Sequence, residues 1–486
     1  MIWLVLGLAT LASCALVQRL PILARFRRAS LQAHRAMRLI ANPAVSDHWK
    51  ERALPRYALR LGLDSLTGFG LLVVALAPFL VLVAIDQAWP QGIWAALLDW
   101  RGLAFVMAVA LACLAVARMR STRSAPATVD ASGYSALSRT LHRLGLARPR
   151  QVEMLFDLES ATAPPPPAGA DAGRHVFVAG LARAGTTALT RAIHASGAFA
   201  SLTYRDMPFV AAPNLWSRLA SRSRREMART ERAHGDGVMV DFDSPEALEE
   251  PFWRAFCGEA YIRPDTLLPH EVEAETRQRY RTFVGHVLAR HGRGRYLAKN
   301  NNNLLRLDAI VETFPNAVVL VPFRDPFAQA RSLQRQHARF AASPDPFVRD
   351  YMTWLVHHEF GQDHRPFVIG STRPQGSPAT LDYWLALWVS VHRHLLARAE
   401  AGGEAVVPVA YEDLCAGDGL AWQALCRRIG IAPDAGTFRP AAAVPAADAS
   451  PSLRREAEGL YLALLALSHG RLGLGQDVPG RARAVA

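Results

Sequence analysis

The distribution of hydrophobic residues divides the chain into two parts of different character. The first 125 residues contain three apolar stretches, at residues 2–17, 66–85 and 103–117. The middle one has no charge, and a helix rising about 1.5 Å per residue over this length crosses a hydrocarbon layer of about 30 Å. We therefore expect residues 1–125 to form an all-α transmembrane region with three helices at these positions.

The charges between the apolar stretches favour one orientation. Residues 18–62 hold ten Lys and Arg but only two acids, whereas residues 86–101 hold one arginine, two aspartates and three tryptophans. Basic loops stay on the cytoplasmic side of a membrane, and tryptophan gathers at its interface. The sequence thus predicts a multi-pass protein of the inner or plasma membrane with its main domain in the cytoplasm. The alternative is a buried hairpin of the second and third stretches in a soluble domain.

Beyond the apolar region, residues 126–173 are expected to connect two domains. Residues 134–146 place Leu137, Leu141 and Leu144 on one face of an amphipathic helix. A proline run at residues 164–167 and a Gly/Ala-rich run to residue 173 then form a juxtamembrane linker.

From residue 174 to residue 486 the pattern is that of an α/β domain. Apolar runs suited to buried strands alternate with helical periodicity, which predicts a parallel sheet flanked by helices on both faces. The expected strands are residues 176–179, 296–298, 317–321 and 405–409, and a core helix is expected at 381–397.

The first expected strand leads into a glycine-bounded turn and then a helix. Unpaired N–H groups at such a helix start attract phosphate-like anions. Compared with the Walker A pattern G-x-x-x-x-G-K-[ST], Gly180, Gly185 and Thr187 are kept, Thr186 replaces the lysine, and Arg183 stands in the turn. Kinases and ATPases need that lysine, so this P-loop-like turn predicts an anionic nucleotide handled without γ-phosphate chemistry.

A second motif follows the strand expected at residues 317–321. Arg324 stands after the strand, Pro326 suits a helix start, and Ser332 lies eight residues after Arg324. A guanidinium fork and a hydroxyl suit a phosphate group. The alternative is a surface ion pair between Arg324 and Asp325.

Lysine is almost absent from this chain, which makes its few lysines informative. The 55 basic residues include only Lys50 and Lys299. Lys299 follows an expected strand and lies between the two motifs. A compact ammonium can stabilise charge on one oxygen where a planar guanidinium cannot, so we favour catalysis over a phosphate-neutralising or surface role.

These motifs resemble those of the sulfotransferase family, in particular its membrane-anchored bacterial-type members. Residues 182–187 resemble the 5′-phosphosulfate loop P-[KR]-S-G-T-T, with Ala182 and Ala184 replacing proline and serine. Residues 317–332 resemble the 3′-phosphate motif, and residues 411–414 resemble a late Y-E-D-L segment. The R-K-G-x-x-G-D-W-K segment of the cytosolic branch is missing, which favours the membrane, carbohydrate and tyrosyl-protein branches.

The resemblance implies a sulfotransferase fold and 3′-phosphoadenosine 5′-phosphosulfate as donor. The residues implied at the 5′-phosphosulfate are Arg183, Ala184, Gly185, Thr186 and Thr187. Arg324 and Ser332 are implied at the 3′-phosphate, and Lys299 and Arg183 are implied to be catalytic.

The base that deprotonates the acceptor hydroxyl is harder to assign. Family members with a carboxylate base carry it about two dozen residues after the 5′ loop, and such a base contributes roughly 10²–10⁴-fold. Asp206 is the candidate at that distance, and the alternative is that it pairs with Arg205 or caps a turn before Pro208. His234 is a second candidate. The acids of residues 241–250 (Asp241, Asp243, Glu246, Glu249 and Glu250) are expected to cap and solvate a helix starting near Pro245.

Composition excludes several other classes of protein. The net charge of +13 is not concentrated in a basic run with interleaved aromatics, so we expect no nucleic-acid partner; an anionic nucleotide and a membrane surface explain it. The five cysteines form no C-x-x-C pair. His357, His358, Glu359 and His364 approach the H-E-x-x-H pattern but fail it because residue 362 is glutamine, so a structural or acceptor-site role is favoured and no metal is expected.

The sequence therefore predicts a membrane-anchored sulfotransferase that moves a sulfuryl group to an acceptor hydroxyl, carried by a lipid or a lipid-linked sugar. Two alternatives remain open. One is a P-loop-like kinase or NTPase, and the other is a non-catalytic membrane protein that binds a nucleotide.

Overall fold

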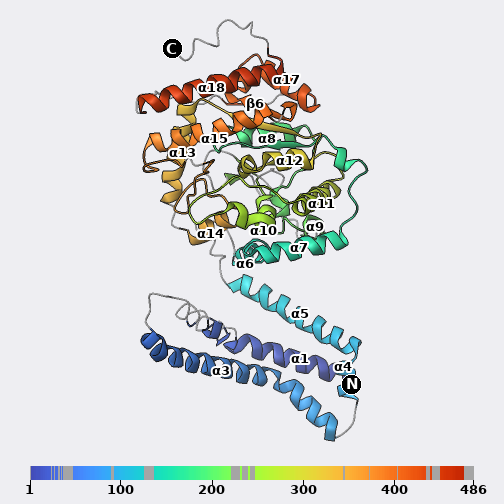
Figure 1. Cartoon of the computed structure of the whole chain (residues 1–486). Coiled ribbons are helices and arrows are strands. Elements are labelled where there is room, and N and C mark those ends of the chain that lie inside the picture. Colours follow the sequence, from blue (N-terminus) through green and yellow to red (C-terminus); the bar gives the residue numbers. More distant parts are fainter. Residues whose placement is uncertain are drawn as a thin grey trace. The chain divides into compact units, whose positions relative to one another are not determined.

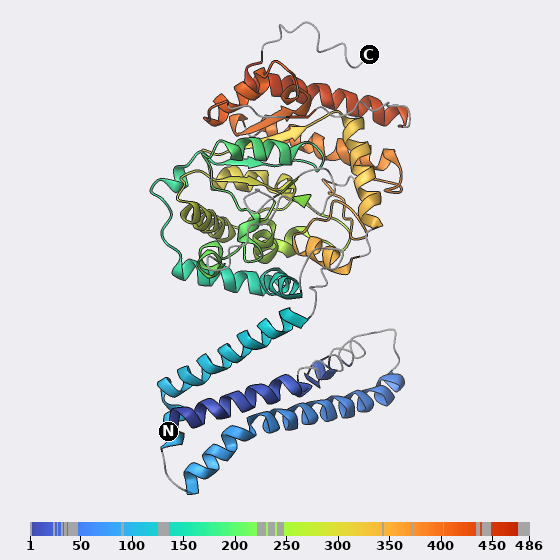
Figure 2. The same cartoon turned by 180° about the vertical axis from the view of Figure 1, so that it is seen from behind.

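The computed structural model divides into two compact units, Met1–Thr128 and Val129–Ala486. They can be followed by colour in Figure 1 and, from behind, in Figure 2. The structure describes residues 2–22, 25–26, 28–30, 33, 36, 47–88, 92–124, 136–220, 230–231, 239–240, 247–342, 345–370, 373–401, 403–433, 438–439 and 449–474.

The N-terminal unit is helical, as expected. Its helices are α1 (Ile2–Arg19), α3 (Asp47–Ala88), α4 (Ile93–Leu98) and α5 (Trp100–Ser124). Helix α1 packs against α3 and α5, with Trp3 edge-on to Phe105. The start of α4 is held by Asp86, whose carboxylate accepts hydrogen bonds from the N–H groups of Ile93 and Trp94.

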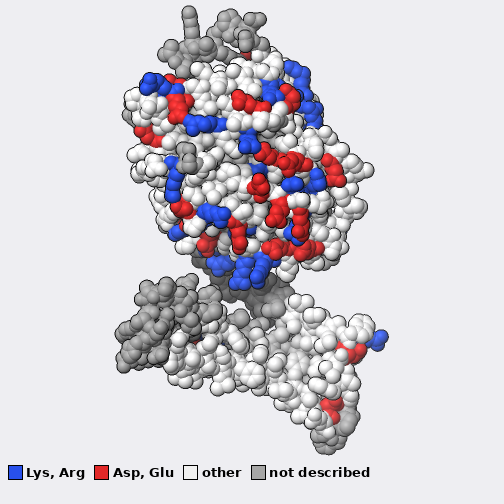
Figure 3. Space-filling view, in the orientation of Figure 1, with Lys and Arg blue, Asp and Glu red and all other residues white. Residues whose placement is uncertain are grey.

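Two helical segments of this unit are long and apolar enough to cross a bilayer, Ile2–Arg19 and Tyr57–Gln87. A third apolar segment, Trp100–Cys113, is shorter. Large apolar side chains of the second segment are exposed, among them Leu66 and Phe69 at 71% and 60%. Figure 3 shows few charged side chains on the visible face of this unit.

A parallel four-stranded sheet forms the centre of the C-terminal unit. Its strands are β1 (Val176–Val178), β4 (Leu297–Lys299), β5 (Val318–Phe323) and β6 (Val406–Ala410), in the order β4-β1-β5-β6. All four were expected from their apolar runs, and every residue in them is buried.

Successive residues of a strand point to opposite sides of the sheet, so these buried strands present apolar side chains on both faces. Helices cover both faces. Phe177 and Val319 belong to one apolar core, with side chains of α10, α11, α13 and α15, while Val176 and Val318 belong to a second core with α8 and α17. This arrangement confirms the predicted α/β class.

The helices on and around the sheet span most of the C-terminal unit. Their bounds are α6 (Ala136–Leu146), α7 (Pro149–Thr162), α8 (Thr186–Ala195), α9 (Pro213–Ala220), α10 (Glu250–Tyr261), α11 (Ala274–His291), α12 (Leu307–Thr313), α13 (Pro326–Ala341), α14 (Pro346–Trp354), α15 (Leu381–Ala401), α16 (Tyr411–Leu414), α17 (Leu420–Ile429) and α18 (Pro451–Leu472).

Short elements complete the unit. They are the 3₁₀ helices η1 (Ala170–Ala172), η2 (Tyr204–Asp206), η3 (Asn301–Leu305) and η4 (Gly403–Ala405), and the strands β2 (Thr230–Glu231) and β3 (Met239–Val240), which pair with each other.

The segment expected to link the two units instead contributes two helices to the C-terminal one. Helix α7 buries Val152, Phe156 and Glu159 and packs against α10. The Glu159 carboxylate accepts hydrogen bonds from the N–H groups of Asn214 and Leu215 at the start of α9. These contacts start the compact unit well before residue 174, the boundary expected from the sequence.

Candidate active site

The carboxyl ends of the parallel strands bring the predicted site residues to one edge of the sheet. Strand β1 leads into the turn that holds Arg183, β4 ends at Lys299, and β5 is followed by Arg324. Val178 pairs with Lys299 on one side and with Leu320 on the other. Open parallel sheets bind their ligands at this edge.

The turn between β1 and α8 has an unusual backbone. Arg183 and Gly185 have φ angles of 70° and 87°, a left-handed conformation that side chains other than glycine rarely adopt. A Cβ atom on Gly185 would lie 2.2 Å from the ring of Tyr411. Glycine is therefore required here both for its conformation and for the close approach of Tyr411.

Gln329 of α13 holds the turn from the inside. Its Nε2 donates hydrogen bonds to the carbonyl oxygens of Leu181 and Ala182 at 3.3 and 2.9 Å, and its Oε1 accepts one from Trp388 Nε1 at 2.9 Å. The carbonyl groups of the turn are thereby bound. The N–H groups at the start of α8 are among those that a helix leaves without partners of its own.

The two arginines and the serine singled out in the sequence lie together. Arg183 Nε donates a hydrogen bond to Ser332 Oγ at 3.0 Å, and Arg324 donates one to the carbonyl oxygen of Arg183 at 3.4 Å. Arg324 Nε is buried and has no hydrogen-bond partner among the described residues. An unpaired buried donor favours an acceptor from a ligand.

The segment between Arg324 and α13 is fixed by α16. The N–H group of Asp325 donates to Glu412 Oε1 at 2.9 Å, while Asp325 Oδ1 accepts from the N–H of Ala328 and caps α13. Within the described residues Asp325 makes no salt bridge with Arg324. The surface ion pair considered from the sequence is thus replaced by a helix cap.

Lys299 lies at the end of β4 and is 7% exposed. The next residue, Asn300, donates its N–H to the carbonyl oxygen of Val178, and its Oδ1 accepts from the N–H of Asn302. Its Nδ2 donates to Glu250 Oε2. These bonds on both sides fix the direction in which the chain leaves Lys299.

The expectation that Glu249 and Glu250 are solvated helix-capping residues is wrong, because each is only 1% exposed. Glu250 forms a buried salt bridge with Arg306 at 3.0 Å. Glu249 accepts hydrogen bonds from Tyr280, Tyr296 and Asn303, and burial raises its pKa. Through Asn300 and Asn303, the two acids hold the segment that follows Lys299.

Asp206 ends η2, on the stretch that continues the sheet beyond β4 through the bridge between Ala200 and Tyr296. Its Oδ2 accepts hydrogen bonds from Thr203 N and Oγ1 at 2.9 and 3.3 Å. Burial raises its pKa from 3.8 to about 6. The capping role considered from the sequence is present, and the role as base stays a prediction.

The other histidine candidates separate into two groups. His234 lies outside the described residues. His357 lies 3.6 Å from Glu359 through Nδ1, and Asn301 Nδ2 donates to the same carboxylate at 2.9 Å. Burial alone would raise the pKa of Glu359, but His357 and these hydrogen bonds lower it to about 2. His364 hydrogen-bonds Tyr383 and the carbonyl oxygen of His358.

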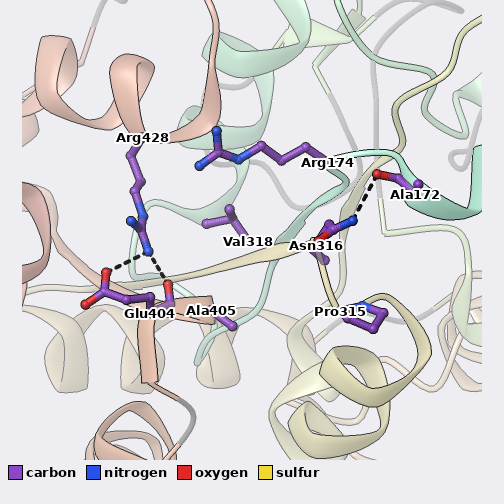
Figure 4. Close-up of a pocket in the computed structure, with 9 residues that line it drawn as sticks. Ala172, Arg174, Pro315, Asn316, Val318, Glu404, Ala405 and Arg428 are labelled. Carbon is purple, nitrogen blue, oxygen red and sulfur yellow. Dashed lines mark hydrogen bonds and ion pairs between the residues drawn. The ribbon is translucent and has the colours of Figure 1, made fainter. Parts of the chain in front are cut away.

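A separate cavity of about 420 Å³ lies at the opposite, amino edge of the sheet. Figure 4 shows it beside Val318, the first residue of β5, with the side chain of Arg174 extending toward Arg428. Arg428 is paired with Glu404 at 2.8 Å. None of the residues predicted to bind the donor lines this cavity.

Sequence reasoning missed the residues that support the turn. Gln329 and Trp388 occupy ordinary positions on helices, and only their contact with the turn reveals a role. Tyr411 and Glu412 belong to the segment that resembles Y-E-D-L, and that resemblance assigns them no specific contact.

Comparisons with known proteins complete these observations. The model of the sulfotransferase family matches residues 175–435. No curated protein matches the chain. Among solved structures, a sulfotransferase from Mycobacterium tuberculosis H37Rv is 17% identical, with 72% of this chain and 89% of that chain covered and a TM-score of 0.37.

Two other solved sulfotransferases are comparably distant. The one from Mycobacterium avium is 16% identical (74% of this chain, 90% of that chain, TM-score 0.36). The one from Alicyclobacillus acidocaldarius is 13% identical (62% and 95%, TM-score 0.29). Because the family model covers more than half of the chain, including both motifs at the carboxyl edge, this protein belongs to the sulfotransferase family.

Proposed function

We propose that this sulfotransferase is membrane-anchored and moves a sulfuryl group from 3′-phosphoadenosine 5′-phosphosulfate to an acceptor hydroxyl on a lipid or lipid-linked sugar. Arg183 and the N–H groups of Ala184, Gly185, Thr186 and Thr187 would bind the 5′-phosphosulfate. Arg324 and Ser332 would bind the 3′-phosphate.

The observation that carries this proposal is the convergence of Arg183, Arg324 and Ser332. The hydrogen bond between Arg183 and Ser332 joins the two motifs across 149 residues of sequence. A nucleotide with phosphates at both its 5′ and 3′ positions supplies acceptors for both arginines at once. The buried, unpaired Nε of Arg324 supports such an acceptor.

The transfer itself would be an in-line displacement at sulfur. The acceptor oxygen forms a bond to sulfur as the bond from sulfur to the 5′-phosphate oxygen breaks, and the products are a sulfate ester and adenosine 3′,5′-bisphosphate. Lys299 would stabilise the charge that grows on the leaving oxygen. Asp206 would accept the hydroxyl proton, and a pKa of about 6 suits a base at neutral pH.

The kinase alternative is disfavoured by Thr186, which stands where the phosphate-binding lysine of a Walker A loop is needed. The alternative of a non-catalytic binding protein predicts stoichiometric nucleotide binding without turnover.

The membrane part of the proposal is supported by the two helical segments long enough to cross a bilayer and by the basic residues 18–62. We propose that the C-terminal unit faces the cytoplasm. A reporter that is active only outside the membrane, fused after Ala486, should be silent. Strong reporter activity would reverse the orientation.

The function is tested with the purified full-length protein in lipid nanodiscs, host membranes and ³⁵S-labelled donor. We expect label in a lipid-extractable product, identified by mass spectrometry, that is absent with the Lys299→Ala variant and present with the Lys50→Ala control. Label transfer from γ-³²P-ATP with Mg²⁺ instead would select the kinase. Donor binding without any labelled product would select the binding protein.

A further inference from the structure

Helices α6 and α7 present an exposed apolar and basic surface on the C-terminal unit. We propose that this surface, defined by Leu144, Met154 and Leu158 with Arg143, Arg148 and Arg150 and called the α6–α7 face below, rests on an anionic phospholipid bilayer. The inference rests on the membrane anchoring proposed above, and it adds which side of the enzyme meets the lipid.

The apolar side chains of this face are exposed, with no covering element among the residues that the structure describes. Leu144, Met154 and Leu158 are 51%, 63% and 52% exposed. On α7, Arg150, Met154 and Leu158 follow one another at intervals of four residues, so they form a continuous stripe on one side of the helix. Contiguous exposed apolar side chains of this kind mark interaction surfaces.

Only part of the leucine face expected for α6 is exposed, since Leu141 is half-buried. His142, Gly145 and Leu146 face the unit and are buried, whereas Leu144 of the expected leucine face is exposed. The inward side is held by close packing: a Cβ atom on Gly145 would lie 2.3 Å from the carbonyl oxygen of Pro208, and His142 is edge-on to Tyr351. The leucine is thus left for a partner outside the unit.

The charge of the face suits anionic headgroups. Arg143, Arg148 and Arg150 are exposed, against the exposed Asp157 and the half-buried Glu153. Figure 3 shows blue side chains gathered along the lower border of the C-terminal unit, where Figure 1 places α6. Apolar side chains interleaved with arginine are the composition of helices that lie in a membrane interface.

The chain itself keeps this face near the membrane. Helix α5 ends at Ser124 and α6 begins at Ala136. Even a fully extended chain across these residues spans only about 40 Å. If the N-terminal unit lies in the bilayer, α6 and α7 are the first elements of the C-terminal unit that can reach its surface.

The inward side of α6, behind the α6–α7 face, adjoins the segment of the proposed base. Helix α6 packs against Pro208, and Trp216 of α9 donates a hydrogen bond to the carbonyl oxygen of Arg205 at 3.1 Å. Asp206 lies between these two contacts. An acceptor hydroxyl at the level of the lipid headgroups would therefore approach the enzyme from the side on which Asp206 is held.

The test uses the full-length protein in vesicles, with the photocrosslinking residue benzoylphenylalanine at position 154 or 158. Position 462 of α18 is the matched control, because Leu462 is 58% exposed and α18 lies at the end of the unit away from α6 and α7 in both views. We expect lipid adducts at positions 154 and 158 in phosphatidylglycerol vesicles, few in phosphatidylcholine vesicles, and none at position 462.

Charge reversal sharpens the test. The Arg143→Glu and Arg150→Glu changes should each lower the adduct yield at position 158 by about fivefold, whereas Arg455→Glu on α18 should leave it unchanged. Crosslinks between two protein copies at position 158 would assign the face to a dimer and overturn the proposal. So would an absence of lipid adducts at positions 154 and 158, or equal yields in the two kinds of vesicle.

These outcomes are independent of sulfuryl transfer, because a Lys299→Ala protein should still give lipid adducts. A protein that fails to float with vesicles at all would contradict the anchoring proposed above, and circular dichroism of each variant separates misfolding from loss of contact.

Discussion

The two edges of the central sheet both carry arginine but use it differently. At the amino edge, Glu404 pairs with Arg428 at 2.8 Å and with Arg471 at 2.6 Å, beside the cavity of about 420 Å³. At the carboxyl edge, Arg183 contacts a serine hydroxyl and Arg324 contacts a backbone carbonyl. Arg324 makes no salt bridge in the part of the chain that the structure describes.

This difference favours the carboxyl edge for the anion binding proposed above. An arginine that already shares a carboxylate has part of its charge and several donors satisfied within the protein, so it gains less from a phosphate. Arg324, which donates to a neutral carbonyl oxygen and whose buried Nε has no partner among the described residues, gains more. The amino edge thus has a cavity whose arginine is already paired, whereas the carboxyl edge offers Arg324 for the proposed nucleotide.

The largest effect is expected for Asp206→Asn, at the candidate base. The amide keeps the shape of the carboxylate but cannot accept a proton, so turnover should fall by about 10²–10⁴-fold with little change in donor affinity. In the wild type, turnover should rise with pH through about 6, the pKa of Asp206. Single-turnover kinetics across pH measures both, and Asp171→Asn near the amino edge is the control.

A turnover that survives within a few-fold would leave Asp206 as a capping residue and make His234 the next candidate. In that case the main measurable effect of Asp206 would be on the pH dependence of folding stability. Burial raises its pKa from 3.8 to about 6, so its stabilising contribution is present below about pH 4 and lost as the pH rises. Between acid and neutral pH, the free energy of unfolding of the wild type should fall by up to about 3 kcal/mol relative to that of Asp206→Asn.

The next largest effect is expected at Lys299. The Lys299→Ala change should lower turnover by roughly 10²–10³-fold, the cost of removing one fixed electrostatic donor, while donor affinity changes far less. Lys299→Arg should be nearly as damaged, because a planar fork does not fit one oxygen in a buried position. A fully active Lys299→Arg enzyme would reduce the role of this residue to general positive charge.

A smaller effect, on binding alone, is expected at Arg324. The wild type should bind adenosine 3′,5′-bisphosphate roughly 10- to 100-fold more tightly than AMP, because the 3′-phosphate accepts charge-assisted hydrogen bonds. Arg324→Ala should erase this preference with AMP binding nearly unchanged, and Arg335→Ala, exposed on the same helix, should keep it. Calorimetry decides the point, and equal affinities in the wild type would remove the assignment of the 3′ site.

The smallest effect is expected at the amino edge. Arg174→Ala and Arg428→Ala should change turnover and donor affinity by less than about twofold. Arg428→Ala should cost up to about 1 kcal/mol of folding free energy, since Glu404 is largely exposed. A tenfold loss of donor affinity in either variant would show that both edges bind the nucleotide and would end the contrast between them.

Much of this architecture could be predicted before the structure. The four strands, the core helix α15 and the turn between Gly180 and Gly185 follow from apolar runs, helical periodicity and glycine positions. These are local signals. The sequence did not predict that α6 and α7 pack into the C-terminal unit or that Glu249 and Glu250 are buried. An acidic residue or a short amphipathic segment is expected to be solvated unless its partner is known.

What the sequence by itself determined is the positions of the four strands along the chain, the two motifs predicted to bind phosphate and the rarity of lysine, because each depends only on residue types and neighbours along the chain. The tertiary structure alone decided that Gln329 supports the turn, that Tyr411 requires a glycine at position 185, and that Arg183 meets Ser332. These pairs are far apart in the chain. Such contacts are set by how whole helices and strands pack, and no local pattern of residue types specifies them.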